Sequence, residues 1–373
     1  MSLKKRFIIL LKFFGLIFLL SKSPINAQIL KDSVSLDLVK KSIDYIYNLK
    51  FNDAGEARKK LSQAYPGHPV LYLLEGMQTY WENYPLPPSS SACVSFENDL
   101  RRCIELSGSN NNQPSEPEYL LANLSARGML LLFYDDNDLT MSVIPLAAST
   151  YQYIRRSFDY TSVYVDFFFF TGLYNYSREA YPEAFPVYKP LALLFPKGDK
   201  LEGLKELLIA AKNSILYKAE AYSFLSEINL SFENNYEQAY DYSKSLHELY
   251  PANIQYLAMY VRNLLLTKRY DIAEELMESS GTNIANSFYK AELSIFKGVL
   301  QEKKYNNYKL AEKYYTEGIQ NISLFGHFGN EFAAYGYFGL SRISGRNGDS
   351  NFNKTYLKKA VQLADFKKVN FDE

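Results

Sequence analysis

Two stretches of the chain match each other at a spacing of 34 residues, and this period constrains the fold more than any other feature. Tyr236 and Ala239 in the first stretch correspond to Tyr270 and Ala273 in the second. A period of 34 residues is typical of a helix–turn–helix unit. Because one such unit cannot bury its apolar face alone, neighbouring units must stack, and the sequence predicts an array of helix pairs.

The same pattern recurs along the chain. Units are predicted at about 35–68, 220–253 and 254–287, another follows around Tyr308, and a last, looser one lies around Tyr337. A small residue is expected where the helices approach most closely, and a proline is expected to end the second helix. The small residues at the first kind of position include Ala54, Ala239, Ala273 and Ala311. The prolines at the second kind are Pro66 and Pro251. The pattern resembles the tetratricopeptide repeat (TPR), which implies an all-α, TPR-like α-solenoid of antiparallel helix pairs.

Two segments interrupt the repeat. Residues 84–117 have Pro-, Ser- and Asn-rich loop composition around a short helix expected near 92–107, and residues 177–200 carry four prolines that exclude a long regular helix. The predicted organisation is a signal peptide at 1–27, N-terminal TPR-like helices at 28–164, an irregular Pro-rich helical insert at 165–212 and C-terminal TPR-like repeats at 213–373.

Residues 165–250 resemble a more particular family. The segments that carry the resemblance are Phe170-Thr171-Gly172-Leu173-Tyr174-Asn175-Tyr176, Phe195-Pro196-Lys197-Gly198-Asp199-Lys200, Leu201-Glu202-Gly203-Leu204-Lys205-Glu206-Leu207 and Lys218-Ala219-Glu220-Ala221. Their order is similar to a TPR family found in many exported bacterial proteins and to the eukaryotic inclusion-body-clearance proteins. The resemblance implies a helical scaffold with an irregular insert and no catalytic residues. The chain departs from the family at Phe195-Pro196, where a Gly-Phe type of turn is expected.

The first 27 residues have the layout of a secretory signal peptide. Three basic residues, Lys4, Lys5 and Arg6, precede an apolar run from Phe7 to Leu20, and small Ala27 follows a short polar stretch. This predicts cleavage after Ala27, because the run is shorter than a membrane anchor and contains a lysine. The protein is therefore expected to be exported, in the periplasm or associated with the outer envelope.

The charge balance argues against nucleic acid as a partner. The chain has 41 basic and 41 acidic residues, and the leader contains five basic residues and no acidic ones. The processed chain would carry a net charge of −5, whereas phosphate binding requires a basic patch. Association with an envelope membrane is expected only through a partner.

Aromatic residues make up 16 % of the chain, with 33 Tyr, 25 Phe and one Trp. One interpretation is that the rings fill the gaps between stacked helix pairs. The other is that they form an exposed surface for sugars or peptides. The first is preferred, because aromatic rings mostly contribute buried area.

The sequence does not decide whether Cys93 and Cys103 form a disulfide or remain free thiols. An exported protein meets oxidising conditions that favour a disulfide. If both residues lay on one continuous helix, however, they would be about 15 Å apart, too far to bond.

Residues with catalytic or metal-binding patterns are scarce. His68, His247 and His327 lack a partner at helical ligand spacing, and the chain contains no nucleophile elbow and no phosphate-binding loop. The sequence predicts no enzymatic activity, cofactor or metal site. A third alternative is a hydrolase with an unrecognised site in residues 177–200, which convergence of Asp199, Glu202 or Lys200 in a deep pocket would support.

A partner-binding groove is the remaining candidate site. In TPR proteins the first helix of each pair lines such a groove, and Arg262 there could pair with a carboxylate of a peptide, although an ordinary exposed arginine is the simpler interpretation. The candidate groove residues are Phe224, Gln255, Ala258, Arg262, Tyr174 and Tyr176.

The leading hypothesis is an exported helical-repeat scaffold that binds a protein or peptide, within an envelope assembly. The alternative is a glycan-binding protein of a bacterial polysaccharide-uptake system, akin to helical-repeat starch-utilisation proteins. The alternative is weakened by the single Trp and by the lack of a cysteine for lipid attachment after the leader.

Overall fold

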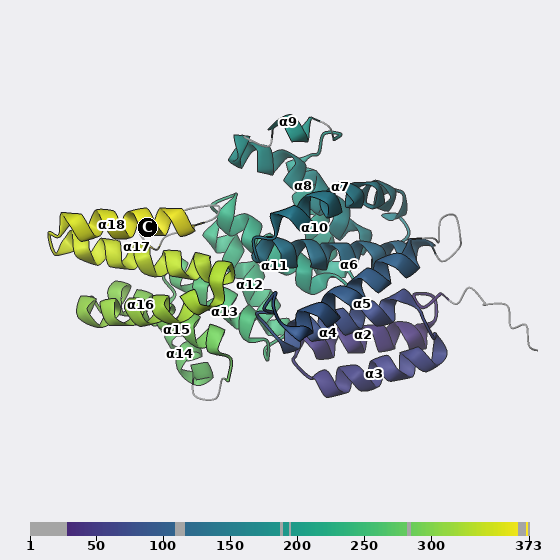
Figure 1. The fold of residues 1–373 in the computed structure, drawn as a ribbon, viewed down its shortest axis with the longest axis horizontal. Coiled ribbons are helices and arrows are strands. Elements are labelled where there is room, and N and C mark those ends of the chain that lie inside the picture. Colours follow the sequence, from purple (N-terminus) through teal and green to yellow (C-terminus); the bar gives the residue numbers. More distant parts are fainter. Residues whose placement is uncertain are drawn as a thin grey trace, which may run out of the picture.

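The computed structural model describes residues 28–108, 116–186, 189–193, 195–281, 285–364 and 371, and every regular element in these ranges is a helix (Figure 1). The helices are α2 (Ser33–Tyr47), α3 (Phe51–Ala64), α4 (Pro69–Glu82), α5 (Ser91–Ser107), α6 (Glu116–Asp136), α7 (Thr140–Ser157), η1 (Phe158–Tyr160), α8 (Phe167–Ala184), α9 (Lys189–Ala192), α10 (Lys200–Asn213), α11 (Lys218–Ser231), α12 (Tyr236–Leu249), α13 (Ile254–Leu266), α14 (Tyr270–Gly281), α15 (Ser287–Lys303), α16 (Tyr308–Ile322), η3 (Ser323–Gly329), α17 (Asn330–Arg346) and α18 (Ser350–Leu363). The expected signal peptide at 1–27 lies outside the described residues. Among the helices named above, none is both long and apolar enough to cross a membrane.

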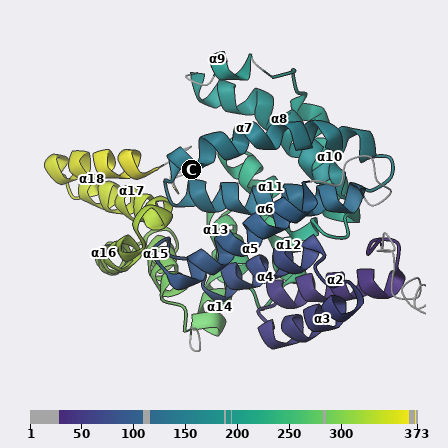
Figure 2. The ribbon, with the colours of Figure 1, turned by 45° about the vertical axis from the view of Figure 1, so that its right-hand side comes forward.

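Most of these helices pack as side-by-side pairs, as the 34-residue period predicted. The pairs are α2/α3, α4/α5, α6/α7, α8/α10, α11/α12, α13/α14, α15/α16 and α17/α18. Successive pairs stack on one another, and the last two project to one side of the body (Figures 1 and 2).

The repeated alanines lie where the helices approach most closely. Ala54, Ala239, Ala273 and Ala311 come from four different pairs, and each is 0 % exposed. A larger side chain at these positions would push the two helices of a pair apart, because protein interiors are close-packed. The steric interpretation of the repeat is therefore confirmed.

Asparagine side chains begin four of the repeat helices. Asn235, Asn253, Asn286 and Asn307 each accept a hydrogen bond from a backbone N–H two or three residues further along. These bonds satisfy donors that the first turn of a helix leaves unpaired. Each helix can thus begin directly after a short turn, which keeps the pairs compact.

Helices α8 and α10 form a pair inside the segment predicted as an irregular insert. The irregular part is confined to residues 185–199, where the hydroxyl of Tyr174 donates to the carbonyl of Pro196 at 2.7 Å. Asp199 caps α10 by accepting from the N–H groups of Leu201 and Glu202. Pro182 lies inside α8, and the other three prolines, Pro186, Pro190 and Pro196, lie between the two helices without preventing their packing.

Two glycines allow α8 and α10 to touch through their backbones. A Cβ atom added at Gly203 would lie 2.5 Å from the backbone nitrogen of Tyr176 and 2.8 Å from the carbonyl oxygen of Gly172. A Cβ atom at Gly172 would lie 2.9 Å from the backbone nitrogen of Leu207. Both glycines therefore lie where the two helix backbones approach closely.

Cys93 and Cys103 both lie on helix α5, and both are free and buried. This is the continuous-helix arrangement in which their separation prevents a bond. The helix itself matches the one expected near residues 92–107 in the first interruption. Part of the following loop, 109–115, lies outside the described residues.

We expect the two thiols to be unreactive in the native protein. Burial raises the pKa of both Cys93 and Cys103, which disfavours the thiolate that attacks a disulfide reagent. Titration of the purified protein with an aromatic disulfide should therefore detect two thiols per chain only after unfolding in denaturant. Detection of none after unfolding, before any reductant is added, would show that the thiols are bridged.

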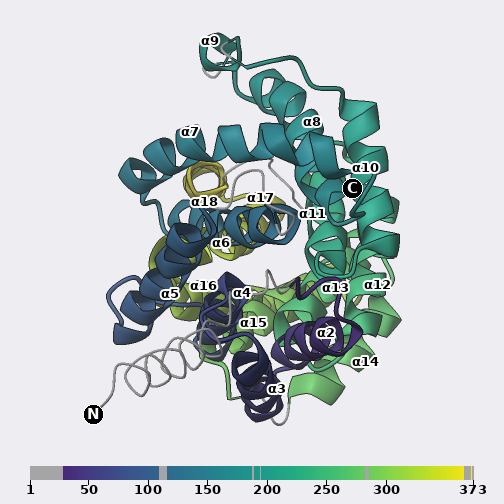
Figure 3. The ribbon, with the colours of Figure 1, turned by 90° about the vertical axis from the view of Figure 1, so that its right-hand side faces the viewer.

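The N-terminal pairs close back onto the middle of the chain. Seen along the long axis, the helices from α2 to α13 follow one another around a ring (Figure 3). At the closure the amide of Asn253 donates to the carbonyl of Tyr47 at 3.1 Å, and the Tyr47 hydroxyl donates to Glu220 on α11. The Tyr47 ring also packs against Trp81 of α4 and Tyr256 of α13. This contact joins elements about 200 residues apart, and the repeat pattern did not predict it.

Candidate functional site

A group of polar side chains joins the first helices of the last four pairs, α11, α13, α15 and α17. We call this side of the solenoid the first-helix face, and the side formed by α12, α14, α16 and α18 the second-helix face. The group, named here the Arg262 cluster, consists of Glu227, Gln255, Arg262, Glu292, Glu331 and Tyr335.

Arg262 lies at the centre of this cluster. Its Nη1 donates to Glu331 on α17 at 3.1 Å, and its Nη2 donates to Glu227 on α11. The Arg262 side chain is 4 % exposed, whereas those of Glu227 and Glu331 are 39 % and 43 % exposed. Its Nε has no hydrogen-bond partner among the described residues. The guanidinium therefore ties three pairs together, while the two carboxylates remain accessible to water and to a ligand.

Glu292 adds a buried carboxyl to the cluster. It is 0 % exposed, its Oε1 accepts from Gln255 Nε2 at 3.2 Å, and its Oε2 has no partner within the described part of the chain. Burial raises the pKa of Glu292 to about 8, although the Gln255 bond and the charge of Arg262 oppose the shift. The buried Glu292 carboxyl therefore holds its proton at neutral pH.

We expect stability to fall as the pH rises from about 4.5 to about 8, because of Glu292. In this range the native carboxyl keeps a proton that the unfolded chain releases, so the stabilisation is complete below the lower value and lost above the upper one. At about 1.4 kcal/mol per pKa unit, the full shift corresponds to a loss of roughly 5 kcal/mol. Urea unfolding measured across this range tests the expectation, and Glu292→Gln should flatten the curve. An unchanged slope in the variant would assign the effect to other groups.

The structure brings together two of the six predicted groove residues. Gln255 and Arg262 lie in the cluster, but Arg262 is already paired within the chain. Ala258 is 1 % exposed and packs in the core of the same helix stack. Phe224, on α11, is partly buried and packs against Phe169. Two of the six residues therefore lie in the Arg262 cluster, and a role of any of them in binding a partner stays a prediction.

Tyr174 and Tyr176 lie away from this cluster, on α8. Tyr176 is 1 % exposed, and its hydroxyl donates to Glu233 at 2.5 Å, so its ring belongs to the core rather than to a groove. Tyr174 packs beside Tyr151 and reaches the irregular segment through Pro196. Both residues contribute to the packing of the α8/α10 pair in this structure.

Four cluster residues were missed by sequence reasoning, and one of them left a readable signal. Glu292 lies on α15 between the apolar residues Ala291 and Leu293. A carboxyl in such a place indicates a buried polar site. Glu227, Glu331 and Tyr335 gave no comparable signal, because exposed residues of these types are common on any helix.

Two aromatic side chains from non-helical parts of this chain are seated on the first-helix face. Tyr84, which follows α4, packs edge-on against Phe288 and Phe328, and its carbonyl accepts from Asn286 at 2.8 Å. Phe371, beyond α18, packs edge-on against Tyr335 of the cluster at 5.5 Å between ring centroids. The first-helix face therefore accepts aromatic rings from segments that are not part of the repeat.

The residues named for the hydrolase alternative do not converge. Lys200 pairs with Glu183 and Glu233, Glu202 pairs with Lys205, and the Asp199 side chain caps α10. Two cavities in the described structure lie elsewhere: one of about 570 Å³ is lined by residues 233–237 and 266–268, and one of about 260 Å³ lies around Glu302, Arg342 and Arg346. Both lie near helix ends, and the larger one borders the predicted insert through Glu233, which pairs with Lys200.

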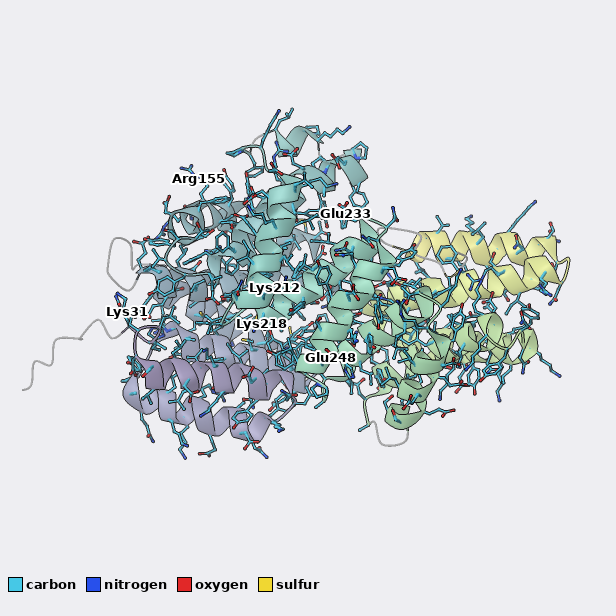
Figure 4. The ribbon with its side chains drawn as sticks, turned by 180° about the vertical axis from the view of Figure 1, so that it is seen from behind. Lys31, Arg155, Lys212, Lys218, Glu233 and Glu248 are labelled. Atoms are coloured by element: carbon cyan, nitrogen blue, oxygen red, sulfur yellow. The ribbon has the colours of Figure 1, made fainter. Side chains whose placement is uncertain are left out.

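The surface seen from behind carries charges of both signs. Lys212 and Lys218 project there in the same view as Glu233 and Glu248 (Figure 4). Basic and acidic side chains are therefore interspersed on this side of the molecule.

The fold and the cluster define the protein as an all-α, TPR-like solenoid of helix pairs. In comparisons with known proteins, no family model and no curated protein matches the chain. Among solved structures the chain is similar to yeast Tom70, with 14 % identity over 89 % of this chain and 92 % of that chain, at a TM-score of 0.26. The resemblance of residues 165–250 to an exported bacterial family stays a prediction.

Proposed function

We propose that this protein is an exported, non-enzymatic scaffold that binds a basic segment of a protein or peptide partner on its first-helix face. The proposal is supported chiefly by the Arg262 cluster, in which two accessible carboxylates share one buried guanidinium. The cluster keeps an excess of negative charge even while Glu292 is protonated. A lysine or arginine of a partner would supply the missing positive charge through charge-assisted hydrogen bonds.

The buried oxygen of Glu292 strengthens this choice of partner. A buried polar atom without a hydrogen bond is unfavourable, and Glu292 Oε2 is such an atom within the described structure. Because Glu292 is 0 % exposed, an ammonium group bound at Glu227 and Glu331 would act on it through its charge, which favours the ionised form. Binding of a cation would therefore be accompanied by release of a proton near neutral pH.

Affinity capture from the envelope fraction, followed by mass spectrometry, tests the proposal. The tagged chain is compared with a Glu227→Gln/Glu331→Gln variant and with a matched Glu237→Gln/Glu274→Gln variant, whose carboxylates lie on the second-helix face and pair with Arg269 and Lys304. We expect the first variant to lose a partner that the second retains. Equal recovery with both variants would contradict binding at the cluster.

Export and the place in an envelope assembly are part of the proposal. They rest on the layout of residues 1–27, which precede the described structure. Amino-terminal sequencing of the protein recovered from the envelope fraction should give Gln28 as the first residue. Recovery of an uncleaved chain from the cytoplasm would contradict export, without affecting the assignment of the binding face.

No observation favours the glycan-binding alternative. Among the described residues, the aromatic side chains more than a third exposed are Phe158, Tyr305 and Phe352, at 39 %, 49 % and 56 %. They belong to η1, to the turn after α15 and to α18, so they form no shared platform for a sugar ring. Saturable binding in a calorimetric sugar panel would nevertheless restore that alternative.

A further inference from the structure

Phe371 occupies a defined place on the first-helix face. Its side chain is 5 % exposed and belongs to the same apolar cluster as Phe332 and Tyr335 of α17. The rings of Phe371 and Tyr335 are 5.5 Å apart with an interplanar angle of 76°, the edge-to-face geometry that aromatic pairs prefer. A phenylalanine outside the helix pairs is thus as well buried as a residue of the core.

The seat of Phe371 is continuous with the Arg262 cluster. The Tyr335 hydroxyl donates to Glu331, and Glu331 in turn accepts from Arg262. An aromatic side chain that packs against the Tyr335 ring, as Phe371 does, therefore lies close to the accessible carboxylate of Glu331. A peptide with an aromatic residue close to a basic one could occupy both places at once.

We propose that the seat of Phe371 is the aromatic subsite for the partner's peptide, and that Phe371 is an internal competitor that the peptide displaces. The inference rests on the proposed function and adds its ligand chemistry: an extended segment with an aromatic residue near lysine or arginine. The sequence just before Phe371 contains Lys367 and Lys368, which is the same combination of residue types.

Tyr84 supports the idea that this face takes single aromatic anchors. It enters the first-helix face from a loop, as Phe371 does, and packs on Phe288 and Phe328. The backbone carbonyl of Tyr84 also accepts a hydrogen bond from the side-chain amide of Asn286. Phe371 contributes a single ring to its apolar cluster. An aromatic ring of a bound peptide in the same place would preserve this packing.

If Phe371 competes for the seat, an external peptide should bind the unmodified chain with a lower apparent affinity than it would bind an empty seat. A segment tethered close to its site has an effective concentration in the millimolar range, so even a weak contact is well occupied. An external peptide binds only the fraction of molecules whose seat is free, and its apparent affinity falls by that fraction. Removing the Phe371 side chain should abolish this penalty.

The test uses a fluorescein-labelled peptide with the sequence of residues 365–373, DFKKVNFDE, and the full-length chain. By fluorescence anisotropy, Phe371→Ala should bind this probe at least about tenfold more tightly than the unmodified chain. A matched Phe352→Ala variant, which removes an exposed ring from α18, should leave the affinity unchanged. A probe with alanine in place of its second phenylalanine should bind neither protein.

The outcomes separate the inference from the proposed function. Equal probe affinity for Phe371→Ala and the unmodified chain would overturn internal competition, and so would failure of the probe to bind either protein. If the partner capture described above still depended on Glu227 and Glu331, the proposed function would stand in both cases. Thermal melts of the two variants confirm that each is folded before the affinities are compared.

Discussion

Replacing Arg262 by methionine is expected to lower the free energy of unfolding by about 2–4 kcal/mol. Methionine keeps much of the apolar stem of the arginine but leaves Glu227 and Glu331 without their shared partner. Loss of one member of a fully buried ion pair costs about 3–5 kcal/mol. The expected loss is smaller here because the two carboxylates are 39 % and 43 % exposed and keep part of their hydration.

The matched control for this variant is Arg269→Met. Arg269 donates two hydrogen bonds to Glu237, at 2.8 and 3.1 Å, and the two side chains are 32 % and 65 % exposed, against 4 % for Arg262. Exposed pairs contribute about 0.2–1 kcal/mol, so this variant should unfold close to the unmodified chain. Denaturant unfolding followed by circular dichroism measures both. Similar small losses in the two variants would show that Arg262 does not hold the pairs together.

Gly203→Ala is expected to destabilise the protein by about 1–3 kcal/mol, although alanine is the better helix former. The added methyl would meet the backbone of α8 at Tyr176 and Gly172, and backbone atoms cannot move aside as a flexible side chain can. The α8/α10 pair would have to separate, exposing part of the apolar cluster that contains Phe167 and Leu207.

Gly55→Ala provides a control of opposite sign. Gly55 lies in helix α3, and a Cβ atom added there meets nothing within 4 Å. The same substitution should therefore stabilise the protein by about 0.5–1 kcal/mol, through helix propensity alone. Thermal unfolding of the two variants side by side distinguishes the packing effect from the propensity effect. A stabilised Gly203→Ala protein would contradict the backbone contact.

The repeat could be predicted from sequence because its key positions have a steric cause. Alanine recurs at Ala54, Ala239, Ala273 and Ala311 because two helix axes approach there, and the consequence of that approach is visible in residue type alone. Gly172 and Gly203 gave a second signal of the same kind, since glycine is unfavourable inside a helix unless something requires it.

The candidate site could be predicted only as a face. The period placed Gln255 and Arg262 on a first helix, but the partners of Arg262 are 35 and 69 residues away in sequence. No local pattern links a glutamate on α11 with another on α17. Tyr176 was misplaced because an aromatic residue gives the same signal in a core as in a groove.

The ring closure was also beyond the reach of a repeat argument. The 34-residue period specifies how one pair stacks on the next, whereas the contact between Tyr47 and Glu220 depends on how stacking rotations accumulate over the intervening pairs. Small differences in packing at each step decide whether the first pair meets the middle of the chain. These differences arise from side-chain volumes that a degenerate repeat does not fix.

A photo-crosslinking experiment tests most directly whether the partner lies on the first-helix face. Benzoylphenylalanine is placed at Gln255 on α13, or at the exposed Gln238 on α12 as the matched position on the second-helix face. After irradiation with the envelope fraction, the account predicts a discrete crosslinked species from Gln255 and none from Gln238. A partner crosslinked from Gln238 alone would contradict it.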